Sequence, residues 1–309
     1  MSETLIPLLG LFSKLLVYLG SAAVIGGWFS LMLIREQPEL SNAIRRYILT
    51  GVLLALVAVA MNFFAQVGSF AESGWGGLFD TMYVAMLWDS PVGSSVVFRI
   101  CALSLMLCAS LLASRNAFNA SSLTNSDLRR LLLVLIAGTG SLLLAFSYSL
   151  IGHTAELDLI AQLLISLHVL IALGWIGSLL PLWQACRDAN QHNANPEVLQ
   201  QLMYRFGRIA MGLVAVLLVC GVVLAYQLLG SVSELISTPY GLLLLAKMGL
   251  VAVMLSFAVW HKWRLVPQLT DQAAVLRLQR SILLEGLTGL SILLVTILLT
   301  TVVGPDAVH

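Results

Sequence analysis

Long apolar runs separated by short polar segments follow one another along the whole chain. The runs are continuous rather than alternating, which indicates helices rather than strands. A helix needs about 20 apolar residues to cross a bilayer, and each run reaches that length. The pattern predicts an all-α membrane protein with about eight transmembrane helices, at residues 5–34, 46–70, 91–114, 129–152, 158–186, 206–230, 239–263 and 281–303.

Composition indicates that lipid is the solvent of this chain. Of its 309 residues, 59% are hydrophobic and 10% are charged, whereas soluble domains have about 45–50% apolar and about 25% charged residues. We therefore expect a single polytopic membrane domain over residues 1–309. The segment Met1–Pro7 lacks the basic residues of a signal peptide, so the first run is expected to be a retained helix.

The charges divide the polar segments into two sets. Acidic residues but no lysine or arginine occupy both termini and every second connecting segment. The positive-inside rule places the basic segments in the cytoplasm and both termini on the outer face. Thirteen of the sixteen basic residues lie in the other four segments: Arg35, Arg45, Arg46, Arg115, Arg129, Arg130, Arg187, Arg205, Arg208, Lys262, Arg264, Arg277 and Arg280.

The longest outer segment, residues 71–90, carries Trp75, Tyr83 and Trp88. Aromatic residues are typical of the membrane interface. We expect a short amphipathic helix on the surface here. In such a helix Met82 and Met86, four residues apart, would share one face.

An internal repeat links the third and seventh predicted helices. Ser90-Pro91-Val92-Gly93 precedes Arg99, and Thr238-Pro239-Tyr240-Gly241 precedes Lys247, with the same spacing. Lys14 and Gly20 of the first helix align loosely with His168 and Gly174 of the fifth. Two parallel four-helix repeats, residues 1–150 and 151–309, fit this pattern, although proline is also common at helix starts for capping reasons.

Five charged or histidine residues fall inside the predicted helices, away from their ends: Lys14, Arg99, His168, Lys247 and Glu285. Such residues are costly in lipid and often functional. Arg99 and Lys247 would either extend to the lipid headgroups or hold an anionic group. Glu285 would pair with a nearby lysine or arginine, or mark an exit for a cation.

Candidate metal ligands occur at the outer face and within the membrane. His153 follows the fourth helix beside acidic residues, and His168 lies about 15 Å below the outer surface at 1.5 Å per residue. Met61, Cys101 and Cys220 are predicted at the depth of His168, and soft sulfur ligands select Cu(I). The alternative is that His168 is a hydrogen-bonded core residue and that methionine and cysteine only fill space.

Several function classes have no support in the sequence. No GxxxxGK[ST] motif is present, which argues against an ATP-driven pump. There is no soluble catalytic domain, and we expect the chain not to be an enzyme. The basic residues are accounted for by topology, so no nucleic-acid partner is expected.

Several separated motifs occur together in the second half of the chain. The chain resembles the copper resistance protein D (CopD) family of bacterial inner-membrane proteins, most strongly over residues 150–305. The first half resembles it more weakly, from Gly93 to Arg99. The motifs are Gly152-His153, His168, Trp175-Ile176-Gly177, Leu179-Leu180-Pro181, Arg205-Phe206, Gly221, Thr238-Pro239-Tyr240-Gly241, Lys247, Arg264-Leu265-Val266-Pro267, Arg280-Ser281 and Glu285.

The resemblance implies a copper-handling inner-membrane protein with eight helices and periplasmic termini. Copper would be captured near His153 and passed to a site around His168, and a separate periplasmic CopC-like protein could be the partner. Two positions depart from the expected family pattern. His261-Lys262 stands where Asn-Arg is expected, and Lys14 where relatives could carry histidine.

Two other functions remain open from the sequence. A b-type haem-binding electron-transfer protein would use His168 as an axial ligand, with Arg99 and Lys247 near the propionates. His153 is about 15 Å too shallow to be the second axial ligand, although methionine can take that role. A structural subunit that docks a periplasmic partner would bind no metal.

Overall fold

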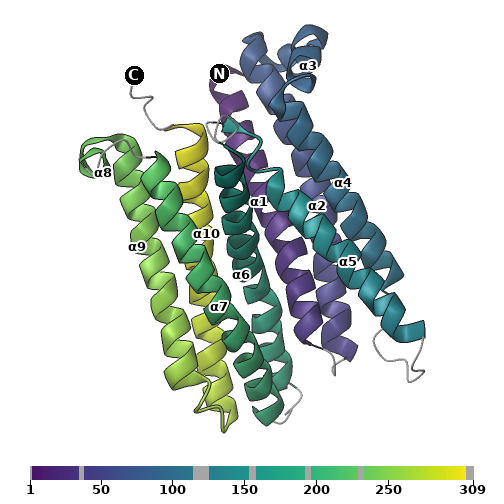
Figure 1. The fold of residues 1–309 in the computed structure, drawn as a ribbon, viewed down its shortest axis with the longest axis vertical. Helices are drawn as coiled ribbons and strands as arrows, with labels where there is room; N and C mark the ends of the chain where they lie inside the picture. The colour runs from purple at the N-terminus through teal and green to yellow at the C-terminus, as the bar shows by residue number, and fades with distance from the viewer. Residues whose placement is uncertain are drawn as a thin grey trace. The chain divides into compact units, whose positions relative to one another are not determined.

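The computed structural model describes residues 2–34, 38–113, 125–152, 158–191, 196–228 and 233–303. Within these residues the chain is helical and contains no strand, so the predicted all-α fold is confirmed (Figure 1). Eight of the described helices are long and apolar enough to cross a membrane. The predicted number of transmembrane helices is therefore also confirmed.

Short helical elements accompany two of the long helices, α4 and α9. A short 3₁₀ helix (η1) and the short helix α3 precede α4, the four-residue α8 precedes α9, and a π-helical turn (η3) follows α9. The bounds are α1 Ser2–Leu33, α2 Pro38–Ala71, η1 Gly74–Phe79, α3 Thr81–Trp88, α4 Pro91–Leu112, α5 Asn125–Phe146, α6 Leu159–Gln191, α7 Pro196–Leu228, α8 Glu234–Ser237, α9 Pro239–Trp260, η3 His261–Leu265 and α10 Gln272–Thr301.

Several helix ends differ from the prediction. The helices α2, α7 and α10 begin eight to ten residues earlier than hydropathy predicted, at Pro38, Pro196 and Gln272. Hydropathy marks only the part of a helix that lies in lipid, whereas backbone hydrogen bonding continues into the polar, basic first turns. The helix α5 ends six residues early, at Phe146, because the chain then tightens into turns and reaches Gly152 with a positive φ of 74°.

The chain forms two compact units. Unit 1 comprises Met1–Val24 and Tyr47–Leu170, and unit 2 comprises Ile25–Arg46 and Ile171–His309. The boundaries fall inside α1, α2 and α6, so each of these helices contributes residues to both units. The predicted division at residue 150 into repeat halves stays a prediction.

In unit 1, small residues bring α1 and α2 into close contact. A Cβ atom added at Gly20 would lie 2.8 Å from the Ala55 Cβ and 2.9 Å from the Gly51 carbonyl oxygen. Such approaches stabilise helix pairs in lipid, where packing replaces the hydrophobic effect. The helices α4 and α5 also pack along each other (Figure 1). A core cluster surrounds these contacts, formed by Val17, Ala58, Val59, Phe63, Val67, Leu87 and Val96.

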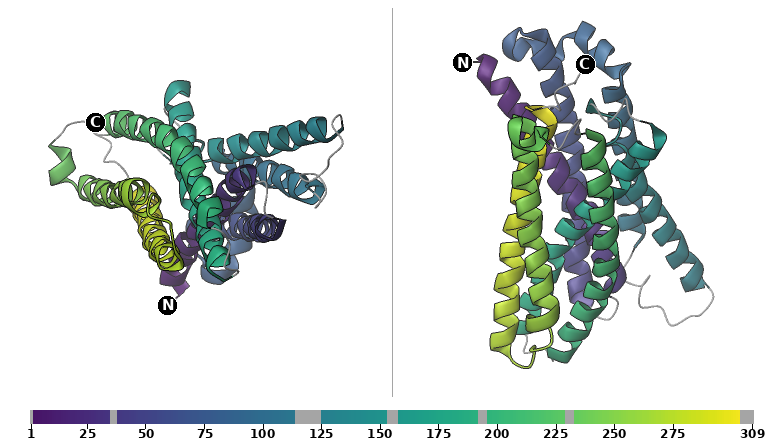
Figure 2. Two further views of the ribbon diagram at one scale, coloured as in Figure 1. Left: turned by 90° about the horizontal axis from the view of Figure 1, so that it is seen from below. Right: turned by 60° about the vertical axis from the view of Figure 1, so that its left-hand side comes forward.

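In unit 2, glycines again allow close packing. Gly26 of α1 meets the backbone of Gly177 in α6, where a Cβ atom would overlap the Gly177 main chain. The helices α9 and α10 run side by side, as both views of Figure 2 show. This pair and the part of α6 from Ile171 onward contribute the side chains of the polar network described below.

The predicted sequence repeat corresponds to a repeated local structure. The hydroxyl of Ser90 accepts a hydrogen bond from the Val92 N–H at 3.1 Å and caps α4. Thr238 caps α9 in the same way, through the Gly241 N–H at 3.0 Å. In both helices proline occupies the first turn, where its missing N–H costs nothing, and a short helix packs against that turn.

The segment of residues 71–90 is helical, as predicted, but in two pieces. Asp80 separates η1 from α3 and caps α3 by accepting from the Met82 N–H at 3.0 Å. The side chains of Met82 and Met86 are 67% and 46% exposed, so both face outward. Phe79, Val84 and Trp88 line an open groove of about 400 Å³ beside α3.

The glycine that opens α9 gives a test of this fold. A Cβ atom at Gly241 would overlap the carbonyl oxygen of Glu234 in α8, whereas one at Gly249 would meet nothing within 4 Å. We expect Gly241→Ala to destabilise the protein by about 1–3 kcal/mol through overpacking. Gly249→Ala should be neutral or stabilising by about 0.5–1 kcal/mol. Thermal unfolding of both variants in the same detergent measures the difference, and equal melting temperatures would contradict the close α8–α9 contact.

Candidate functional site

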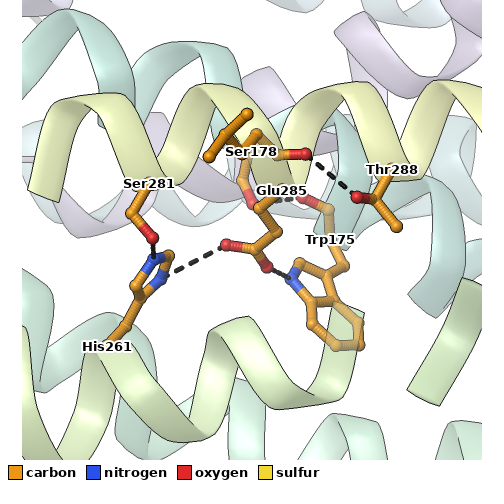
Figure 3. A network of polar contacts seen from close by, with 7 residues as sticks. Trp175, Ser178, His261, Ser281, Glu285 and Thr288 are labelled. Atoms are coloured by element: carbon orange, nitrogen blue, oxygen red, sulfur yellow. Dashed lines mark hydrogen bonds and ion pairs between the residues drawn. The ribbon is translucent and has the colours of Figure 1, made fainter. Parts of the chain in front are cut away.

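A buried carboxyl group lies at the centre of the polar network in unit 2. Glu285 of α10 is 2% exposed. Its Oε1 accepts a hydrogen bond from the Trp175 indole N–H of α6 at 3.0 Å, and its Oε2 lies 3.3 Å from Nδ1 of His261 (Figure 3). Three separate segments therefore meet at one acidic side chain.

The π-helical turn after α9 carries the imidazole. In this turn the Val266 N–H donates to the His261 carbonyl at 2.9 Å, across five residues rather than four. The ring's Nε2 lies 2.7 Å from the Ser281 hydroxyl (Figure 3). Ser281 and Glu285 are one helical turn apart on the same face of α10, so the imidazole bridges two side chains of that helix.

The network can accommodate different numbers of protons. A neutral ring can donate from Nδ1 to the carboxylate and accept at Nε2 from the serine hydroxyl, while a charged ring donates at both nitrogens. A carboxylate in the membrane is costly unless a proton or a positive charge accompanies it. The site is therefore suited to exchanging protons or to responding to a cation.

Of the two alternatives predicted for Glu285, the described part of the chain does not show a pair with a lysine or arginine, and an exit for a cation stays a prediction. Among the described residues its ion-pair partner is His261, and its second partner is an indole. Sequence reasoning noted His261 only as a departure from a family pattern and Trp175 only as part of a motif. Their separation from Glu285, 24 and 110 residues, gives no signal that the three side chains meet.

Unit 1 contains a buried positive charge instead. Arg99 is 6% exposed, and its Nε donates to the Ser147 hydroxyl at 3.2 Å. The guanidinium lies 4.8 Å from the centre of the Tyr148 ring, and the Tyr148 hydroxyl donates to Ser21 at 2.9 Å. Lys14 of α1 is half-buried in the same unit. Arg99 is thus packed inside unit 1 rather than extended to the headgroups, while Lys247 is half-buried on α9 of unit 2.

The predicted metal ligands are distributed over both units. His168 on α6 and Met61 on α2 are half-buried in unit 1, Cys101 on α4 is exposed in unit 1, and Cys220 on α7 is buried in unit 2. His153 lies outside the described residues. Among the residues that the structure describes, no three His, Cys, Asp or Glu side chains are grouped to hold a metal ion. The proposed ligand set stays a prediction.

The eight apolar helices define a multi-pass α-helical membrane protein. Residues 200–299 match the model of the family "Copper resistance protein D". The predicted resemblance to this family is thereby confirmed over this segment, which contains both His261 and Glu285.

One curated relative is similar along nearly the whole chain. Copper transport protein CutJ of Bacillus subtilis (strain 168) is 24% identical over 300 residues, which cover 96% of this chain and 52% of the relative. The chain thus spans about half the length of this relative. No solved structure matches the chain.

The two contacts of Glu285 can be tested through stability. Glu285→Ala should leave the Trp175 N–H and Nδ1 of the imidazole without a partner, and each unpaired buried group costs about 1–3 kcal/mol. Glu285→Gln keeps a carbonyl oxygen for the indole and an amide for the ring, so it should unfold closer to the wild type. Thermal unfolding of both variants in detergent checks this order, with Thr288→Ala on the same helix as the control. If the alanine and glutamine variants unfolded at the same temperature, the hydrogen bonds to Glu285 would not contribute as described.

Proposed function

We propose that this protein handles copper in the bacterial inner membrane and moves it from the periplasm into or across the membrane. The observation that carries the proposal is the match of residues 200–299 to the copper resistance protein D family. The similarity to a relative named as a copper transport protein, over 96% of this chain, supports it. Eight candidate membrane spans supply the required framework.

The proposed topology follows from charge. Basic residues at the ends of α2, α5, α6, α7 and α10 would face the cytoplasm, and both termini the periplasm. Copper would then enter near His153 and reach His168, with Met61, Cys101 or Cys220 as further ligands. Thioether and thiolate groups favour Cu(I), and imidazole accepts either oxidation state.

Two further proposals concern partners and alternatives. A separate periplasmic CopC-like copper-binding protein could deliver the metal, since the family is associated with such proteins. The comparisons give no support to the haem-binding alternative, because the family and the relative are both named for copper. If the tests below find neither bound metal nor copper accumulation, they favour a docking role instead.

The role of His168 can be tested in cells. Cells that produce the protein should accumulate more copper than cells without it, and His168→Ala should abolish the difference because the half-buried imidazole is the central predicted ligand. Copper per cell is measured by mass spectrometry, and the amount of protein in the membrane fraction by immunoblot. Ser166→Ala, two residues away on α6, is the matched control. Unchanged accumulation in an inserted His168→Ala variant would exclude His168 from the pathway.

Metal analysis of the purified protein separates copper from haem. We expect stoichiometric copper without the Soret band of haem in the visible spectrum. A strong Soret band with iron would contradict the proposal and favour haem, with His168 as the axial ligand to examine. Absence of both metals, together with no copper accumulation in cells, would leave the docking role.

A further inference from the structure

We propose that Glu285 and His261 form a proton-exchange site that couples copper movement to the movement of protons in the opposite direction. This inference deepens the proposed function and rests on it. In this scheme, two side chains of the network in unit 2 compensate the charge of the transported ion, and neither of them is a predicted copper ligand.

The first argument is the position of the acid. Within the described membrane spans the other acidic residues, Asp188 and Glu197, lie within the last four residues of α6 and at the second residue of α7. Glu285 lies thirteen residues after the start of α10 and is 2% exposed. A carboxyl group kept there needs a proton or a nearby positive charge at all times, so its charge state responds to a cation that moves through the protein.

The second argument is that the network can gain or lose a proton without losing a contact. Ser281 carries a hydroxyl, which can donate to a bare Nε2 or accept from a protonated one. Uptake of a proton by the ring therefore requires only rotation of this hydroxyl at its 2.7 Å distance. The Nδ1 contact to Glu285 and the indole N–H to Oε1 remain in both states.

The third argument is access. The His261 side chain is 14% exposed and that of Glu285 is 3% exposed, so the imidazole is the more accessible partner. His261 begins the π-helical turn that also carries Lys262 and Arg264, which belong to the proposed cytoplasmic side. The ring would thus take up a proton from the cytoplasmic side and release it toward the periplasmic side as copper enters, while Glu285 holds the negative charge inside.

The groups that surround Glu285 support this assignment. In the described chain the titratable side chain in contact with it is His261. The indole of Trp175 from α6 and the hydroxyl of Ser281 from α10 do not change charge at physiological pH. Lys262 of the same turn contacts Met211 of α7, with its Nζ 2.8 Å from the sulfur. Arg277 and Arg280 lie on α10 itself, one to two turns before Glu285.

The number of protons released depends on the charge of the copper ion. With a carboxylate and a doubly protonated ring, the N–H bond at Nε2 breaks when copper approaches, the electron pair stays on nitrogen and the proton passes to water. One proton released for each Cu(I) leaves the charge in the membrane unchanged. For Cu(II), a second proton must leave, and a pair that starts with a protonated carboxyl group can supply it. Copper keeps its oxidation state in this scheme.

Vesicle transport measures the coupling directly. The full-length protein is reconstituted into liposomes that contain a pH-sensitive dye, and Cu(I) kept reduced, or Cu(II), is added outside. We expect copper uptake, measured by mass spectrometry, together with a matching efflux of protons. Uptake without proton movement would overturn the coupling but leave the proposed function intact. No copper uptake by the wild type would overturn the transport function itself.

Variants then assign the protons to the network. In His261→Asn the amide retains hydrogen bonds but cannot exchange protons at physiological pH, and in Glu285→Gln the ring loses the carboxylate that stabilises its second proton. Copper-dependent proton efflux should therefore be lost in both variants. Ser256→Ala on α9, outside the network, should behave as the wild type. Retained efflux in both amide variants would exclude the pair. Infrared difference spectra of the wild type on copper addition give an independent readout, because deprotonation of the ring alters imidazole bands that His261→Asn must lack. An unchanged spectrum would overturn the proposal even if the variants fail to fold.

Discussion

An acidic group inside lipid must be paired within the protein, because no water is available to solvate it. This constraint explains the arrangement of unit 2 around Glu285. An indole from α6 and an imidazole from the turn after α9 both reach the carboxyl group of α10. His261 begins a π-helical turn, an uncommon element that often marks functional sites, and contacts α10 at two positions.

Unit 1 satisfies the same constraint with the opposite charge and different partners. Its buried cation, Arg99, is surrounded by a serine hydroxyl and an aromatic ring rather than by a carboxylate. The capping motif that opens α4 and α9 is shared, and each helix has a basic residue nine positions after the capping serine or threonine. The repeat therefore preserves the start of the helix, while the polar interiors of the two units differ.

The framework could be predicted from sequence because it depends on local and additive properties. Hydropathy located the eight spans, and Ser90-Pro91 and Thr238-Pro239 indicated helix starts through capping chemistry that acts within three residues. The site could not be predicted in the same way. Which residues face Glu285 depends on the rotation of α6, α9 and α10, which hydropathy does not determine. Trp175 looked like an ordinary apolar motif residue because its N–H partner is 110 positions away.

The identity of residue 261 determines what the buried acid can do. The resemblance to the copper resistance protein D family led us to expect asparagine there, and this chain has histidine. An asparagine could donate to Glu285 and still bond to the Ser281 hydroxyl, but its amide does not gain or lose protons at physiological pH. Histidine makes the same two contacts, and its ring can also change charge by gaining or losing a proton. The substitution thus keeps the structural role of the position while making the proton content of the network variable, and Ser281 is suited to this because its hydroxyl serves as donor or acceptor.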